Sequence, residues 1–274
     1  MKAFLKKYPL SAYFILAFSI AWGGILLINF YGRFSLFHGE NVLSEGISGQ
    51  LMLIWLVMIA APAITGLFLK RMVDDKEGLK KLLSLMVRWK VSIQWYAAAV
   101  LIFPALLILI IYSFVLVSAN YTPGLMFATG IGAGLVGGFL EEIGWTGFAL
   151  PKLQLKYTPF TTGIILGFIH AVWHLPGDYL GGISFYNELY LFHFLLWILA
   201  LIAFRLLVIW IYNHSKSLLL AQLAHASFTG CQLIFGPPAA TTSESILWYG
   251  IFAATLCIVV TVIIFKDERL FFQK

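Results

Sequence analysis

Residues 93–118 read IQWYAAAVLIFPALLILIIYSFVLVS, an uninterrupted stretch without a charged side chain. A helix rises about 1.5 Å per residue, so about 20 apolar residues cross the hydrocarbon core of a bilayer. Seven further stretches have the same character, and the expected helices are at 9–30, 51–70, 124–150, 158–180, 188–212, 217–236 and 245–265. The sequence predicts an all-α, polytopic membrane bundle of about eight transmembrane helices, forming one transmembrane domain over residues 1–274.

The composition supports a membrane location. Of the 274 residues, 61% are hydrophobic and only 11% are charged, whereas soluble domains carry about 25% charged residues. The net charge of +6 comes from short basic tracts beside apolar runs, which suit anionic headgroups better than nucleic acid. Cys231 and Cys257 both lie in apolar runs, so we expect neither a disulfide framework nor a thiolate metal cluster.

The distribution of basic residues predicts the orientation. In an eight-helix arrangement, 16 of the 18 Lys and Arg residues fall on one side, and the exceptions are Arg33 and Arg205. Positive residues stay on the cytoplasmic side, so both termini are expected there, in a bacterial plasma membrane. Residues 9–30 are expected to remain as a first helix, because no clear cleavage site follows them. The amphipathic stretch 72–91 is expected to lie along the cytoplasmic interface.

Two acids interrupt the fourth apolar stretch. Residues 137–147 read GGFLEEIGWTG and contain Glu141 and Glu142. Ionisable groups inside a membrane are costly and usually face a cavity, so they indicate a functional site. Adjacent helical residues point about 100° apart. One acid is therefore expected to face a central cavity while the other reaches a neighbouring helix.

Histidines occur on the helices that follow. His170 and His174 are four residues apart and share one helical face, and His225 precedes Thr229 by the same spacing. Together with the two glutamates they predict a shared intramembrane site, because the core helices carry little else that is polar.

Other polar residues receive different interpretations. His193 and Arg205 are weaker candidates for the same cavity, and Arg205 is expected to extend toward the cytoplasmic interface. His38 and His214 are assigned no role. The glycines before the acids favour close helix packing over phosphate binding, since no Lys-Ser/Thr ending follows them.

Three motifs resemble a known family. They are EEIGWTGFALPKLQ at 141–154, WHLP at 173–176 and HASF at 225–228. In this order they resemble the CPBP family of CAAX protease and bacteriocin-processing (Abi) membrane proteins, which is related to the Ras-converting CAAX endopeptidase. The resemblance covers the core helices from about 124 to 236. It implies an intramembrane endopeptidase whose catalytic residues are Glu141, Glu142, His174 and His225, with Thr229 at a position that is usually Asn.

The chain departs from the family pattern at two further positions. Thr146 stands where the family has an arginine that partners the carboxylates, and His170 stands where it has an aromatic residue. His170 is therefore a possible additional site residue, as a replacement proton donor or as a ligand.

The resemblance and the residues together favour hydrolysis of a peptide bond without a metal. In this hypothesis Glu141 activates water with help from His174, His225 and Thr229 stabilise the oxyanion, and Glu142 positions the others. The substrate is a peptide or protein, lipidated or not, met at the membrane lipid. An alternative keeps the site but binds Zn²⁺ through His170, His174, His225 or Glu141.

Two alternatives from other classes stay open. Buried Glu and His chains also serve proton-coupled transporters, although no repeated halves are visible in this sequence. A non-catalytic scaffold or bacteriocin-immunity protein is the other alternative, and the missing arginine at position 146 favours it.

Overall fold

The computed structural model describes residues 2–31, 49–117, 126–236 and 241–273, and in these ranges the only regular structure is helical. Eight of the described helices have at least 18 residues. They are α2 (Pro9–Tyr31), α4 (Gly49–Val73), α6 (Ile93–Val117), α7 (Phe127–Gly144), α9 (Pro159–Tyr186), α10 (Tyr190–Ser215), α11 (Leu218–Phe235) and α12 (Thr242–Lys266). The all-helical fold expected from the sequence is confirmed. Arg33 and His38 lie outside the described residues.

Shorter helical segments complete the described chain. They are α1 (Lys2–Lys7), α5 (Asp75–Met86), the π-helical turn η2 (Trp145–Ala149), α8 (Leu150–Gln154), the 3₁₀ turn η3 (Asn187–Leu189) and α13 (Glu268–Phe272). Within the described residues, six stretches are long and apolar enough to cross a membrane. One of them, Pro159–Ser215, contains both α9 and α10, and α7 is not among the six. The chain is an integral membrane protein with about eight crossings.

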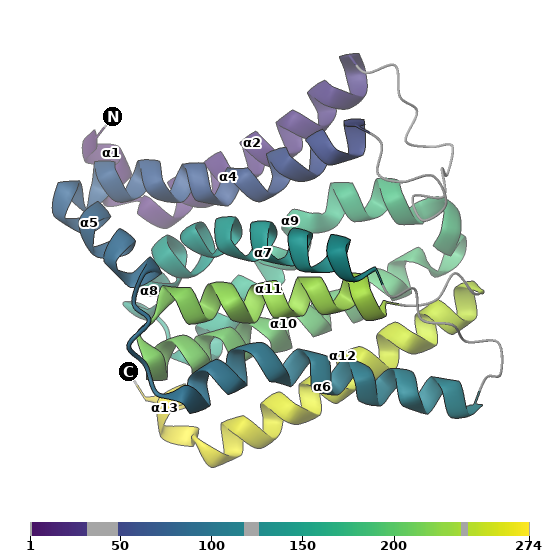
Figure 1. The fold of residues 1–274 in the computed structure, drawn as a ribbon. Helices are drawn as coiled ribbons and strands as arrows, with labels where there is room; N and C mark the ends of the chain where they lie inside the picture. Colours follow the sequence, from purple (N-terminus) through teal and green to yellow (C-terminus); the bar gives the residue numbers. More distant parts are fainter. Residues whose placement is uncertain (1, 32–48, 118–125, 237–240, 274) are drawn as a thin grey trace.

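The long helices form a bundle with a central group and two flanking pairs (Figure 1). Helices α7, α9, α10 and α11 are central, α2 pairs with α4 on one side, and α6 lies beside α12 on the other. The short segments α1, α5, α8 and α13 gather at one end of the bundle. The basic tracts lie at this same end of the bundle, as the charge pattern predicts.

The helices that carry the histidines have well-defined starts. Thr158 caps α9 by accepting a hydrogen bond from the Thr161 backbone N–H at 3.3 Å, and Pro159 follows as the first helical residue. Ser217 caps α11 in the same way. Such caps satisfy backbone N–H groups that otherwise lack partners. They fix where each helix begins, and thus the depth of His170 and His225.

Two expected helix ends lie well before the observed ones. The helix predicted to end at residue 180 continues as α9 to Tyr186. The helix predicted to end at residue 150 continues through η2 and α8 to Gln154. In η2 the backbone N–H of Leu150 donates to the carbonyl of Trp145, a spacing of five residues. The wider turn lets the chain remain helical past Gly144, so Glu141 lies deeper in the bundle than the predicted boundary implies.

The stretch 72–91 contains a helix, as its amphipathic pattern predicts. Helix α5 buries Leu82, which lies over Gly147 of η2. Just before α5, Asp74 accepts from the ammonium groups of Lys70 and Lys152, each at 2.9 Å. Burial raises the pKa of the Asp74 carboxyl, but the two lysines outweigh burial and hold it below its usual value. This contact ties the end of α4 to α8.

Glycines let α7 approach α11 closely. A Cβ atom on Gly138 would lie 2.5 Å from the Ala226 backbone nitrogen, and one on Gly130 would lie 2.7 Å from the Gly230 carbonyl oxygen. Backbone atoms cannot give way as flexible side chains do, so these positions accept only glycine. The close contact places His225 of α11 next to the acids of α7.

Gly138→Ala is expected to lower the free energy of unfolding by about 1–3 kcal/mol, because the added methyl forces α7 and α11 apart. Gly132→Ala is the matched control on the same helix, where a Cβ meets nothing within 4 Å. Alanine favours helix by up to about 1 kcal/mol over glycine, so the control should be neutral or slightly stabilising. Thermal unfolding of the purified protein in detergent measures both. Equal unfolding midpoints for the two variants would contradict the claim that Gly138 is needed for the close contact of α7 with α11.

Candidate active site

The two adjacent acids of α7 point to different neighbours. Glu142 is fully buried and faces α10 and α11, whereas Glu141, with 4% of its surface exposed, faces α9 and a cavity. This is the division expected from the angle between adjacent helical residues.

Glu142 is surrounded by donors. The guanidinium of Arg205 donates from Nη2 to Oε1 at 2.6 Å and from Nη1 to Oε2 at 2.9 Å. Nδ1 of His225 lies 2.7 Å from Oε1, and the hydroxyl of Thr146 donates to Oε2. Such charge-assisted, bidentate contacts are among the strongest hydrogen bonds in proteins. They hold Glu142 ionised and fixed.

The expectation that Arg205 reaches the cytoplasmic interface is wrong. Its side chain is fully buried and binds Glu142 instead. Helix α10 continues from Arg205 to Ser215, a rise of about 15 Å, so water at that end is out of reach. The sequence signal was present, since an arginine well inside an apolar helix usually has a buried partner. Arg205 supplies the cationic partner that position 146 lacks.

Glu141 receives its contacts on one oxygen. Nε2 of His170 lies 3.0 Å from Oε2, and the indole N–H of Trp145 donates to the same oxygen at 3.3 Å. Nε2 of His225 lies 3.9 Å from it. Among the described residues these are the polar contacts of Glu141, so Oε1 is left without one.

His174 and Thr229 lie where two cavities meet. One cavity, of about 340 Å³, is lined by Glu141, His174 and Thr229, and the other, of about 260 Å³, by His174, His225 and Thr229. Trp55 and Trp197 also line both. His174 is half-buried, and its side chain makes no hydrogen bond to another described residue. Its imidazole is free for a ligand.

The remaining histidines lie elsewhere. The ring of His193 stacks on Tyr186, with the ring centres 3.9 Å apart, and its Nε2 lies 3.3 Å from Asp178. Asp178 lines the 340 Å³ cavity. His193 therefore contacts a residue of the cavity wall and does not contact Glu141 or Glu142. His214 pairs with Asp267 and is not part of the site.

Three of the predicted metal ligands lie close together. A carboxylate oxygen of Glu141 and one ring nitrogen each of His170 and His174 lie within 4.8 Å of one another. This set has the donor types that Zn²⁺ prefers. His225, also a predicted ligand, is not in this group.

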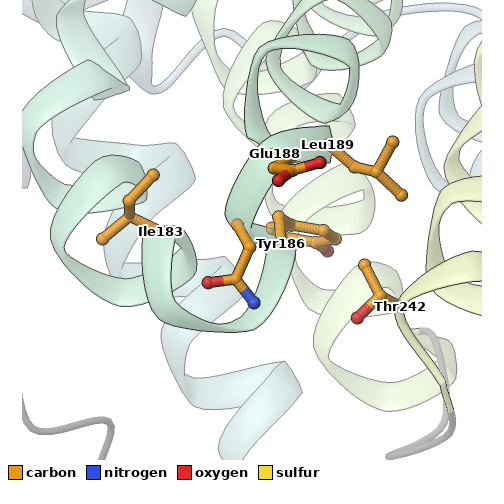
Figure 2. A pocket seen from close by; sticks show the side chains of 6 residues that line it. Ile183, Tyr186, Glu188, Leu189 and Thr242 are labelled. Atoms are coloured by element: carbon orange, nitrogen blue, oxygen red, sulfur yellow. The ribbon is translucent and has the colours of Figure 1, made fainter.

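A larger hollow lies away from these residues. It has a volume of about 740 Å³ and is lined by Ile183, Tyr186, Asn187, Glu188, Leu189 and Thr242. Figure 2 shows that it opens beside the turn from α9 to α10, next to the start of α12. It contains none of the predicted site residues.

A helical membrane bundle that gathers two glutamates, three histidines and an arginine beside cavities has the groups that an intramembrane enzyme needs. Residues 106–231 match the family model described as type II CAAX prenyl endopeptidase, Rce1-like. The "CAAX prenyl protease 2" of Methanococcus maripaludis is 24% identical over 282 residues, covering 98% of this chain and 97% of that protein. These findings confirm the predicted resemblance to CAAX-type proteases and indicate that the chain is a membrane peptidase.

Glu142→Gln and Glu141→Gln are expected to differ in stability. The first leaves the buried Arg205 guanidinium without a counter-charge and should lower the free energy of unfolding by about 3–5 kcal/mol. The second keeps an acceptor for His170 and Trp145, so a loss of about 1 kcal/mol or less is expected. Denaturant unfolding followed by circular dichroism measures both. Equal losses would show that the Arg205 ion pair does not distinguish the two acids.

Proposed function

We propose that this chain hydrolyses a peptide bond where its two cavities meet, using Glu141 to activate water and no metal ion. The observation that carries the proposal is the arrangement of Glu141. Its Oε2 is held by His170 and Trp145, while Oε1 is left for a water molecule. The half-buried His174 lines the same cavity.

The chemistry follows from general acid-base catalysis. Glu141 takes a proton from water, the resulting hydroxide adds to the peptide carbonyl, and the carboxyl then returns the proton to the departing amine. His174 orients the water or relays this proton. Proton transfer of this kind contributes about 10²- to 10⁴-fold to rate.

His225 and Thr229 stabilise the oxyanion that forms when hydroxide adds. Both line the 260 Å³ cavity, and the Thr229 hydroxyl can donate to an oxyanion there. The imidazole of His225 is held beside this cavity by Glu142, whose Oε1 lies 2.7 Å from Nδ1.

The two cavities suit the two sides of a cleavage site. A peptide that places its scissile bond beside His174 and Thr229 can extend into both cavities, whose shared walls include Trp55 and Trp197. Aromatic and aliphatic walls favour an apolar, lipidated segment entering from membrane lipid. The relative's name, CAAX prenyl protease 2, agrees with such a substrate. A bacterial plasma membrane is the proposed location.

Glu141→Gln and His174→Ala are each expected to lower kcat/KM by about 100-fold or more, because each removes a proton-transfer group. Thr229→Ala should lower kcat/KM by at least about 10-fold, because it removes a hydroxyl that can donate to the oxyanion. The assay uses purified protein in liposomes with fluorescence-quenched peptides, one farnesylated at a cysteine near its C-terminus and one unmodified. Cleavage of the farnesylated peptide alone would support lipid recognition.

Two controls match these variants. Glu77→Gln changes an exposed acid of α5, and Ser227→Ala removes a hydroxyl of α11 that donates to the Val100 carbonyl, outside the site. Both should retain activity. Full cleavage by Glu141→Gln and His174→Ala would refute the assignment. A folded wild-type protein that cleaves neither peptide would favour the non-catalytic scaffold, and solute transport by it would favour the transporter.

Chelation separates the metal-free mechanism from the zinc alternative that the Glu141, His170 and His174 group allows. Activity is expected to survive 1,10-phenanthroline, and active protein should contain far less than one zinc per chain by mass spectrometry of its metals. Loss of activity with the chelator, restored by Zn²⁺, would support the zinc-dependent peptidase instead.

A further inference from the structure

Arg205 contacts both Glu142 and His170, the residue that holds Glu141. Besides its two hydrogen bonds to Glu142, its Nε donates to Nδ1 of His170 at 3.3 Å, and its Nη2 lies 3.2 Å from the same nitrogen. His170 is 1% exposed and Arg205 is fully buried, so both groups are shielded from bulk water. A single guanidinium thus touches one glutamate directly and reaches the other through an imidazole.

The contact determines where His170 carries its proton. A guanidinium offers only N–H donors and does not deprotonate in proteins. Nδ1 of His170 must therefore present a lone pair to Arg205. A neutral imidazole has one N–H, which is then at Nε2. An imidazolium is disfavoured here, because its Nδ1–H would face another cation.

The proton on Nε2 has an acceptor in place. Oε2 of Glu141 lies 3.0 Å from this nitrogen, so the imidazole donates to the carboxylate. We propose that Arg205 is a positioning residue of the site: it fixes the Nε2–H tautomer of His170, which holds Oε2 of Glu141 and leaves Oε1 for water. This inference rests on the proposed role of Glu141 as the base.

The same contacts argue against His170 as a metal ligand. Coordination through Nε2 requires a lone pair there, and Nδ1 is already unprotonated against Arg205. The ring would have to become an imidazolate anion, or Arg205 would have to move away from both His170 and Glu142. Histidine ligands of metals normally donate their second N–H to an acceptor, whereas here that nitrogen accepts. The zinc group of Glu141, His170 and His174 therefore does not fit while Arg205 is in place.

Nitrogen-15 spectra of histidine-labelled protein test the tautomer without any activity assay. The His170 signals are assigned by their loss in His170→Gln. Near neutral pH, wild-type His170 should show a protonated Nε2 and an unprotonated Nδ1, unchanged when Zn²⁺ is added. A protonated Nδ1, or a shift of Nε2 on zinc binding, would overturn the proposal.

The Glu142→Gln/Arg205→Met double variant shows whether Arg205 sets the tautomer. It removes both members of the ion pair together, so neither Glu142 nor Arg205 is left as a buried charge without its partner, and the fold is expected to survive. His170 should then lose its single tautomer and show a mixture of forms. An unchanged spectrum in this folded variant would mean that something other than Arg205 fixes the ring.

Kinetics with the peptide substrate test the consequence for Glu141. His170→Leu lacks the donor and should lower kcat by about 100-fold with KM unchanged. His170→Gln places an amide N–H near Nε2 and should retain activity within about 10-fold of the wild type. His214→Gln, at a histidine outside the site, is the matched control. If His170→Gln and His170→Leu lose activity equally, the N–H donor role is wrong.

The outcomes separate this inference from the proposed function. If the wild type cleaves no peptide but shows the Nε2–H tautomer, the proposed function fails and the role of Arg205 in fixing the ring stands. If the wild type cleaves peptides but His170 carries its proton on Nδ1, the inference fails and the peptidase stands.

Discussion

The buried ion pair between Arg205 and Glu142 is the constraint on which the rest of the site depends. Either charge alone inside a membrane bundle would cost several kcal/mol. In the ion pair, which has two hydrogen bonds of 2.6 and 2.9 Å, each charge offsets the cost of burying the other. The pair joins α7 to α10, and His225 brings α11 to the same carboxylate. Three helices are thus fixed around one glutamate, which leaves the neighbouring Glu141 to face the cavity.

Two backbone features make this geometry possible. The glycines of α7 allow α11 to pack against its backbone, which brings His225 within reach of Glu142. The π-helical turn η2 follows the acids directly, and its first two residues, Trp145 and Thr146, contact Glu141 and Glu142. π-turns are often found at functional sites. Here the turn supplies one donor to each acid from the same helix.

The sequence predicted the helices and most of the polar residues that the structure brings together, because both follow from the cost of polar groups in lipid. Long apolar stretches located α2, α4 and α6 to within a few residues, and the rarity of charge inside helices singled out Glu141 and Glu142. Arg205 was misplaced, since a linear pattern shows distance from a helix end but not the neighbour that a side chain meets. The end near residue 150 was missed, because no composition signal marks a π-turn. His193 was not separable from the site histidines by sequence, because its partners Tyr186 and Asp178 come from another helix.

The separation of Glu142 and Arg205 along the chain bears on biogenesis. The two residues are 63 positions apart, and α9 is synthesised between their helices. When α7 leaves the ribosome, its acids have no cation, and each would enter lipid at a cost of about 2.5–3.5 kcal/mol on insertion scales. Glu142 therefore gains its cationic partner only once α10 has been made, so a late helix completes the burial of an early one.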